Sequence, residues 1–253
     1  MKTIQLTDAS IGFSTKRHAP RVLACGISAR LQPGRLTCLV GRNGMGKSTL
    51  LRALAGFQPL LGGAVEVVDD AVPDAAGTTL SALPNAQKAR LVAVVLTDNR
   101  QAQGLTVEEM VGLGRSPYTN FWGTLTDADQ RIVDEAMALT GISHLRKHRM
   151  DTLSDGEQQK TMIAKALAQQ TPIILLDEPT AFLDYPSKAD TLCLLARLAH
   201  EEGKAVLFSS HDLELVFHHA DMLWLLEGGR MTTGPVQEMR PVVASALNMG
   251  PAK

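Results

Sequence analysis

The sequence contains little cysteine, almost no net charge and no long apolar run. Its three cysteines, Cys25, Cys38 and Cys193, are far apart and form no Cys-x-x-Cys pair, which argues for reduced thiols, as in a reducing cytosol, and against a structural metal site. The 25 Lys and Arg residues balance 26 Asp and Glu residues, so the basic excess of nucleic-acid-binding proteins is missing and we expect no nucleic-acid partner. No stretch approaches the roughly 18 apolar residues of a membrane helix, so any membrane-spanning part has to come from a partner.

A phosphate-binding loop is the strongest signal that the sequence does contain. Residues 41–49 read Gly-Arg-Asn-Gly-Met-Gly-Lys-Ser-Thr and fit the pattern G-x-x-x-x-G-K-[ST] at every fixed position. A short apolar strand before the loop and a helix at 48–55 after it give the order that the motif requires. Lys47 would reach the β- and γ-phosphates of a nucleotide, and the Ser48 hydroxyl would bind magnesium. The predicted nucleotide contacts are Gly41, Asn43, Gly44, Gly46, Lys47, Ser48 and Thr49.

Two carboxylates follow a second apolar strand. Residues 172–178 read Pro-Ile-Ile-Leu-Leu-Asp-Glu. Ligands of parallel sheets bind beyond the carboxyl ends of the strands, so Asp177 and Glu178 would emerge beside the phosphate-binding loop. Asp177 would then hold magnesium, and Glu178 would polarise the attacking water. Two solvated acids at a strand end are an ordinary surface feature when seen alone, but their combination with the loop favours the catalytic interpretation.

The distribution of strand and helix signals predicts an α/β fold with an inserted helical segment. Polar and apolar residues alternate over 2–8, and that tendency returns over 21–31, as in an antiparallel sheet, while 91–96 and 172–177 are continuous apolar runs typical of buried parallel strands. Turn-forming residues at 69–80 indicate a surface loop. Between 98 and 156 the strand signal vanishes and helix starts appear at Thr106 and Thr126. We therefore predict a core at 1–97 and 157–235, a helical subdomain at 98–156 and a weakly patterned tail at 236–253.

A third motif begins the helix that follows the helical segment. Ser154 and Glu157, three residues apart, form a capping box at that helix start. Residues 153–159, Leu-Ser-Asp-Gly-Glu-Gln-Gln, also resemble the Leu-Ser-Gly-Gly-Gln signature of ATP-binding-cassette (ABC) ATPases. That resemblance implies a P-loop NTPase core of the RecA-like type that binds ATP and Mg²⁺. It further implies a head-to-tail homodimer, in which Ser154, Gly156 and Glu157 complete the site of the opposite subunit.

Three further positions are similar to those of the same family. Residues 181–184 look like its dimer-contact loop, with Asp184 as the contact residue. His211, about thirty residues after Glu178, is similar to the switch histidine that senses the γ-phosphate, and it is predicted to be catalytic together with Glu178. Phe13 stands where the family has an aromatic residue that stacks on adenine, although an aromatic residue near a strand end is also common in a core.

Two positions depart from the family pattern. After the strand at 91–96 the family has a glutamine that contacts magnesium and water, whereas this chain has Thr97 and Asp98. Asp155 replaces a glycine of the signature, and a carboxylate near a triphosphate is unfavourable unless it points away or pairs with a cation. Coupling between the nucleotide state and a partner is therefore expected to differ here.

Residues 114–118, Gly-Arg-Ser-Pro-Tyr, together with 126–129 and 181–186, resemble the ATPase subunits of importers for iron-siderophore, haem and cobalamin complexes. This implies a peripheral homodimer at the cytoplasmic face of the cell membrane, beneath two membrane-spanning permease subunits and fed by a periplasmic or surface substrate-binding protein. Two alternatives stay open: a soluble ABC ATPase not tied to transport, and a nucleotide-binding module with weak turnover. The aromatic residues within 111–122 either dock a partner helix or pack inside the helical subdomain.

Overall fold

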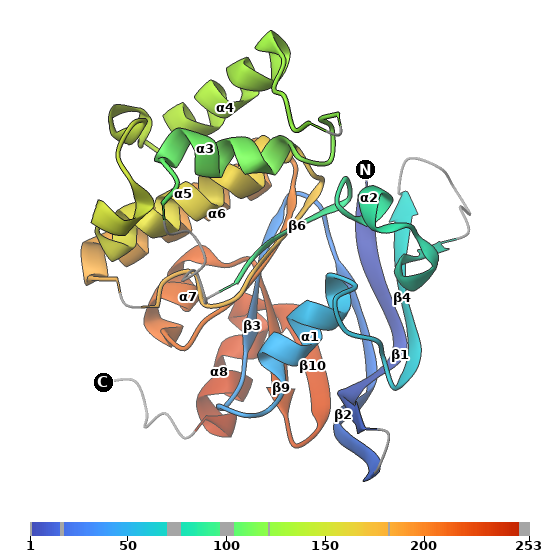
Figure 1. Cartoon of the computed structure of the whole chain (residues 1–253). Coiled ribbons are helices and arrows are strands. Elements are labelled where there is room, and N and C mark those ends of the chain that lie inside the picture. Colours follow the sequence, from blue (N-terminus) through green and yellow to red (C-terminus); the bar gives the residue numbers. More distant parts are fainter. Residues whose placement is uncertain are drawn as a thin grey trace.

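The computed structural model describes residues 2–15, 18–69, 77–96, 104–120, 122–181 and 183–247. Two sheets and a group of helices make up the molecule (Figure 1). The departures noted at Thr97 and Asp98 lie outside the described residues. Within the described ranges, no helix combines the length and the apolar character needed to cross a membrane.

The larger sheet has six strands in the order β10-β9-β3-β8-β7-β6. Its strands are β3 (Arg35–Val40), β6 (Val92–Val95), β7 (Ile173–Leu176), β8 (Ala205–Ser209), β9 (Met222–Glu227) and β10 (Arg230–Pro235). All neighbours are parallel except β10, which pairs antiparallel with β9 at one edge. The buried parallel strands predicted at 91–96 and 172–177 are thereby confirmed. Since β3, β8 and β7 are adjacent, their carboxyl ends meet at one edge of the sheet, where ligands of such sheets bind.

The second sheet confirms the antiparallel pairing predicted for the N-terminal region. Its strands β1 (Lys2–Thr15), β2 (His18–Leu31), β4 (Gly62–Asp69) and β5 (Thr78–Thr79) lie in the order β2-β1-β4-β5. The prediction of a surface loop at 69–80 is wrong for its last three residues, because β5 pairs with β4 and Leu80 is only 1% exposed. Burial of that one leucine outweighs the turn-forming residues around it. Residues 70–76 of the predicted loop lie outside the described residues.

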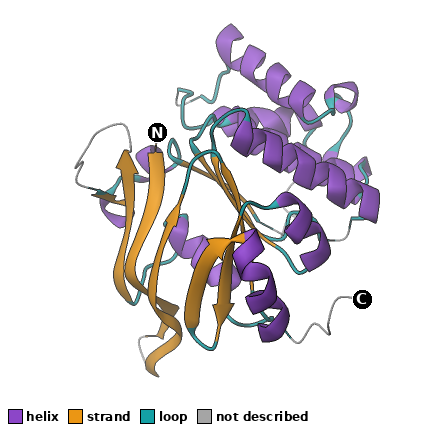
Figure 2. Ribbon diagram, turned by 180° about the vertical axis from the view of Figure 1, so that it is seen from behind, coloured by secondary structure: helices purple, strands orange, loops and turns teal. Residues whose placement is uncertain are grey.

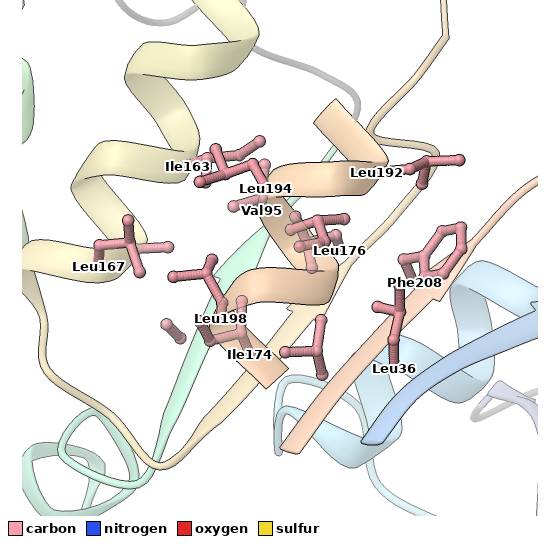
Figure 3. Packing of buried hydrophobic residues seen from close by; sticks show 14 of the residues in the cluster. Leu36, Val95, Ile163, Leu167, Ile174, Leu176, Leu192, Leu194, Leu198 and Phe208 are labelled. Atoms are coloured by element: carbon pink, nitrogen blue, oxygen red, sulfur yellow. The ribbon is translucent and has the colours of Figure 1, made fainter. Parts of the chain in front are cut away.

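The core has two parts, one on each face of the six-stranded sheet. On one face, α1 (Lys47–Leu54) and the four-stranded sheet pack against the six-stranded sheet, with Leu175 and Leu207 among the buried residues. On the other face, α5 (Asp155–Ala168) and α6 (Tyr185–His200) pack against Ile174, Leu176 and Phe208 (Figure 3). Successive residues of one strand thus belong to opposite parts of the core, as the two-residue period of a strand requires.

Three helices after β6 pack against one another as a helical group, seen from behind in Figure 2; two of them lie within the predicted segment 98–156, and the third continues past it. They are α3 (Val107–Gly112), α4 (Asp127–Leu139) and α5, and a short α2 (Asn85–Lys88) precedes β6. Capping boxes begin all three helices of the group, at Thr106, Thr126 and Ser154, so the helix starts read from the sequence are confirmed. At the carboxyl end of α5, a buried arginine, Arg115, donates from Nη1 to the Ala168 carbonyl at 2.8 Å.

The C-terminal region contains a helix that the sequence pattern did not indicate. After α7 (Leu213–His219) and the β9–β10 hairpin, α8 (Val236–Ala246) buries Val236, Met239 and Val243 against the sheet. Pro241 inside the helix weakened its sequence signal, because proline is the least favourable residue of a helix interior. The end of α8 reaches the phosphate-binding loop, where Arg42 donates from Nη2 to the Ala246 carbonyl at 3.2 Å.

Candidate nucleotide-binding and catalytic site

The loop at 41–49 joins the end of β3 to the start of α1, as its motif requires. Gly44 and Gly46 have φ values of 79° and 103°, which residues with a Cβ rarely adopt. A Cβ on Gly44 would have no neighbour within 4 Å, so the backbone faces open space there. Loop N–H groups next to a helix start form a concavity suited to anions, and the loop fits the triphosphate of a nucleotide.

Lys47 is held at the centre of this loop. Its Nζ donates to the carbonyls of Gly41 at 2.7 Å and Arg42 at 3.3 Å. Burial lowers the pKa of Lys47 from its ordinary value, while the negative charges of Glu178 and Asp177 act to raise it. The lysine ammonium is thereby fixed on the same side of the sheet as both predicted carboxylates, where a point charge can bind terminal phosphates.

The two carboxylates after β7 are joined by a serine at the end of β8. The Ser209 hydroxyl donates to Asp177 Oδ1 at 2.8 Å and accepts a hydrogen bond from the Glu178 N–H at 2.9 Å. Glu178 has a φ of 48°, a left-handed conformation that is costly for a residue with a side chain and that clusters at functional sites. This turn sends the Glu178 side chain toward His211, whose Nε2 lies 2.8 Å from Glu178 Oε1.

A single cavity of about 370 Å³ brings most of the predicted nucleotide residues together. It is lined by Phe13, Arg21, Leu23, Asn43, Gly44, Gly46, Lys47, Ser48, Thr49 and Glu178. Phe13 is 47% exposed, so the alternative of a core aromatic is wrong for this residue. Gly41 and His211 line a neighbouring cavity of about 640 Å³ together with Arg42 and Leu247, the residue that follows α8.

The donor set suits magnesium more than a protein-only metal centre. No three His, Cys, Asp or Glu side chains within the described ranges are grouped so that they could hold a metal ion. Asp177 and Ser48 offer oxygen ligands, and Mg²⁺ prefers one or two protein oxygens combined with phosphate and water. These two residues would therefore hold the ion, which neutralises phosphate charge when it is bound.

The signature residues do not line the nucleotide cavity of their own chain. The Glu157 carboxylate accepts hydrogen bonds from the Ser154 N–H at 2.8 Å and the Ser154 hydroxyl at 2.7 Å, and these two bonds lower the pKa of Glu157 from its ordinary value. A Cβ on Gly156 would meet only ordinary contacts, the nearest being Ser187 Oγ at 3.7 Å. Asp184 caps α6 by accepting from the Ser187 N–H at 3.0 Å. The predicted contact of these residues with a nucleotide of a second chain therefore stays a prediction.

Sequence reasoning missed three contributors to the site: Ser209, Arg21 and the end of α8. The signal for Ser209 was a serine pair directly before His211, at the end of an otherwise apolar strand. Arg21 lies on β2, opposite Phe13 across the β1–β2 pair. No local pattern connects α8 to the loop, since the contact joins residues 204 positions apart.

The fold and the site together define a nucleotide-hydrolysing enzyme of the P-loop class. Residues 25–181 match the family described as ABC transporter. The chain is 40% identical over 220 residues to the cobalamin import ATP-binding protein of Halobacterium salinarum, covering 87% of this chain and 52% of that relative, so it spans about half of the relative's length. It is 35% identical over 207 residues to the achromobactin transport ATP-binding protein of Dickeya dadantii, covering 82% of this chain and 74% of that protein.

The fold is that of solved cassettes. A nucleotide-free ATP-binding cassette from an ABC transporter superposes with a TM-score of 0.82 at 20% identity, covering 97% of this chain and 96% of that one. The chain belongs to the ABC transporter family of ATP-binding proteins, and it is an ATPase. Its RecA-like P-loop core with an antiparallel sheet and a helical group agrees with the predicted fold class.

Replacing Ser209 with alanine is expected to slow ATP hydrolysis about tenfold and to lower the free energy of unfolding by about 1–3 kcal/mol, because Asp177 loses a donor and the Glu178 N–H loses its acceptor. Phosphate release and urea unfolding measure the two effects. Ser143→Ala, at an exposed serine of the helical group, is the control and should behave like the unchanged protein. Unchanged hydrolysis in the Ser209 variant would show that the hydroxyl does not hold the carboxylates in place.

Proposed function

We propose that this chain is the ATP-hydrolysing subunit of an importer for a metal chelate of the iron-siderophore, haem or cobalamin type. The observation that carries the catalytic part is the 2.8 Å contact between Glu178 Oε1 and His211 Nε2, made by a carboxylate that lines the phosphate-loop cavity. The transported class is supported by the relatives, whose names describe cobalamin import and achromobactin transport. The resemblance of residues 114–118 to such importers adds to it.

The proposed chemistry assigns one task to each side chain of the cavity. Glu178 accepts the proton of the attacking water, and His211 holds that carboxylate in place through its Nε2 contact. Lys47 and the loop N–H groups bind the phosphates and stabilise the charge that develops on them. Asp177 and Ser48 would hold Mg²⁺, which would supply positive charge that neutralises the phosphates. Phe13 stacks on the base at the other end of the cavity.

A second copy of the chain would complete the site. Ser154, Gly156 and Glu157 lie at the N-terminus of α5, where the helix dipole favours an anion. In the proposed head-to-tail homodimer this helix start meets the γ-phosphate held by the other chain, and Asp184 lies at the contact. Asp155, at the same helix start, is exposed, so in the dimer it has to point away from the phosphate or meet a cation.

The proposed assembly places this homodimer at the cytoplasmic face of the cell membrane, beneath two permease subunits that receive the chelate from a substrate-binding protein. The proposed domain division, a core at 1–97 and 157–235 and a helical subdomain at 98–156, would put the helical group in reach of the permeases. Among the described residues of that segment, Trp122 is 84% accessible, and an exposed aromatic residue suits such a contact.

Reconstitution tests the transport assignment. The full chain is co-expressed with the permease subunits of a metal-chelate importer, and phosphate release and uptake of radiolabelled cyanocobalamin and of a ferric siderophore are measured in vesicles. We expect magnesium-dependent phosphate release that the permeases stimulate, and uptake of one of the two cargoes that stops with Glu178→Gln. Full phosphate release from the chain alone, without stimulation and without uptake, would instead identify a soluble ATPase not tied to transport.

A further inference from the structure

We propose that Arg21 binds the purine base of the nucleotide together with Phe13, so that the two side chains form a base clamp that does not distinguish adenine from guanine. This inference rests on the nucleotide site described above and adds a residue and a specificity to it. Arg21 and Phe13 are directly opposite each other in the β1–β2 pair, and both line the cavity of about 370 Å³ that contains the phosphate-binding loop.

The register of β1 and β2 determines which side chains reach this cavity. Directly opposite residues of an antiparallel pair project from the same face with Cβ atoms about 5 Å apart, so Arg21 projects beside Phe13. The register shifts between Ile11 and Gly12, which marks a β-bulge next to Leu23. Bulges near active sites redirect side chains, and here both Leu23 and Arg21 line the cavity.

Leu23 and Arg21 occupy different positions along the cavity. A Cβ on Gly46 would lie 3.2 Å from Leu23 Cδ1, so Leu23 touches the phosphate-binding loop itself. Arg21 lies two residues before Leu23 on β2, so its backbone is about 6–7 Å away from that of Leu23 along the strand. With the phosphates held at the loop, this distance places the guanidinium at the level of the base and not of the terminal phosphates.

The chemistry of this end of the cavity favours stacking over reading of the base edge. A guanidinium is planar, stacks on aromatic rings and only donates hydrogen bonds. Apart from Glu178 and the residues of the phosphate-binding loop, the lining residues are Phe13, Arg21 and Leu23, and none of their side chains can accept a hydrogen bond from the adenine amino group. Guanine offers two acceptors on its edge, and adenine offers one beside its amino donor. The clamp therefore binds both purines and rejects neither.

Equilibrium binding of ADP and GDP to the purified full chain tests the clamp without any need for hydrolysis. Isothermal titration with Mg²⁺ should give dissociation constants for ADP and GDP within about threefold of each other, because no lining side chain at this end selects between the purines. Arg21→Ala should weaken both by about three- to fivefold, the range of an exposed cation–π contact. Arg21→Lys should bind both nucleotides as weakly as Arg21→Ala, because lysine keeps the positive charge but lacks the planar guanidinium group.

Arg30→Ala is the matched control, because it removes the same charge from the same strand, nine residues from Arg21. Its ADP and GDP affinities should equal those of the unchanged chain. Three results would each overturn the clamp: ADP and GDP affinities of Arg21→Ala equal to those of the unchanged chain, an Arg21→Lys chain that binds as tightly as the unchanged chain, or a preference of more than about tenfold for ADP over GDP. A chain that binds neither nucleotide before any substitution would overturn the nucleotide site itself, which is a separate outcome.

Discussion

Replacing Glu178 with glutamine is expected to lower steady-state ATP hydrolysis by about 10²- to 10⁴-fold, which is the usual contribution of a positioned general base. Glutamine has nearly the same shape as glutamate and can keep the contact with His211 Nε2 that measures 2.8 Å. It cannot take a proton from water. ADP affinity should therefore change by no more than about twofold, because the phosphate contacts of the loop are untouched.

The same variant also tests the homodimer. When hydrolysis stops, ATP should stay bound between two chains, so size-exclusion chromatography with ATP and Mg²⁺ should show a dimer that is absent with ADP. Glu135→Gln, at an exposed position of α4, is the matched control and should hydrolyse ATP at the full rate. Full turnover in the Glu178 variant would remove Glu178 from the role of base, and a monomer with trapped ATP would contradict the head-to-tail arrangement.

The predictable part of the site is the part encoded in short, contiguous motifs. The phosphate-binding loop, the paired acids after β7 and the capping box at Ser154 each occupy a few neighbouring residues, so the spacing alone specifies their local geometry. The Ser209 bridge was missed for the opposite reason. It joins residues 31 and 32 positions apart, through a strand order that only the folded sheet defines.

The missed elements of the fold were decided by burial and not by local propensity. Thr78 and Thr79 form β5 and Leu80 is buried, although turn-forming residues surround them. The helix α8 forms in spite of Pro241, because Val236, Met239 and Val243 find apolar partners on the sheet. Tertiary packing of an apolar face stabilises a helix more than the helix propensity of its residues does. This packing contribution depends on residues far away in the sequence, so a short segment of sequence does not indicate it.

The motif at 114–118 shows how a family resemblance can have a structural cause. Tyr118 was open to two interpretations, docking and internal packing, and its hydroxyl donates to the Gln169 carbonyl at 3.0 Å inside the helical group. The Arg115 guanidinium lies 4.1 Å from the centre of the Tyr118 ring. A Cβ on Gly114 would lie 2.3 Å from the Lys165 carbonyl oxygen, so glycine permits the close approach to α5. Internal packing is therefore correct for Tyr118.

Replacing Arg115 with methionine is expected to lower the free energy of unfolding by about 3–5 kcal/mol, because it leaves a buried carboxylate without its cation. Arg115 is 5% exposed, and its Nε donates to Asp129 Oδ1 at 2.9 Å. Hydrogen bonds from Thr126, with a further contribution from Arg115, hold the pKa of Asp129 at about 2, so the carboxylate is charged at neutral pH. Urea unfolding followed by circular dichroism measures the loss, and the melting temperature should fall by roughly 10 °C.

The loss should exceed that of an ordinary surface charge because Arg115 joins three elements. It connects α4 through Asp129, the end of α5 through the Ala168 carbonyl, and the connecting segment through the Tyr118 ring. Arg131→Met, at an exposed position of α4, removes the same charge and should change stability by less than about 0.5 kcal/mol. Equal stability of the two variants would mean that the ion pair contributes no more than a solvated one. A large loss confined to the Arg115 variant would identify this arginine as the residue that holds the helical group together.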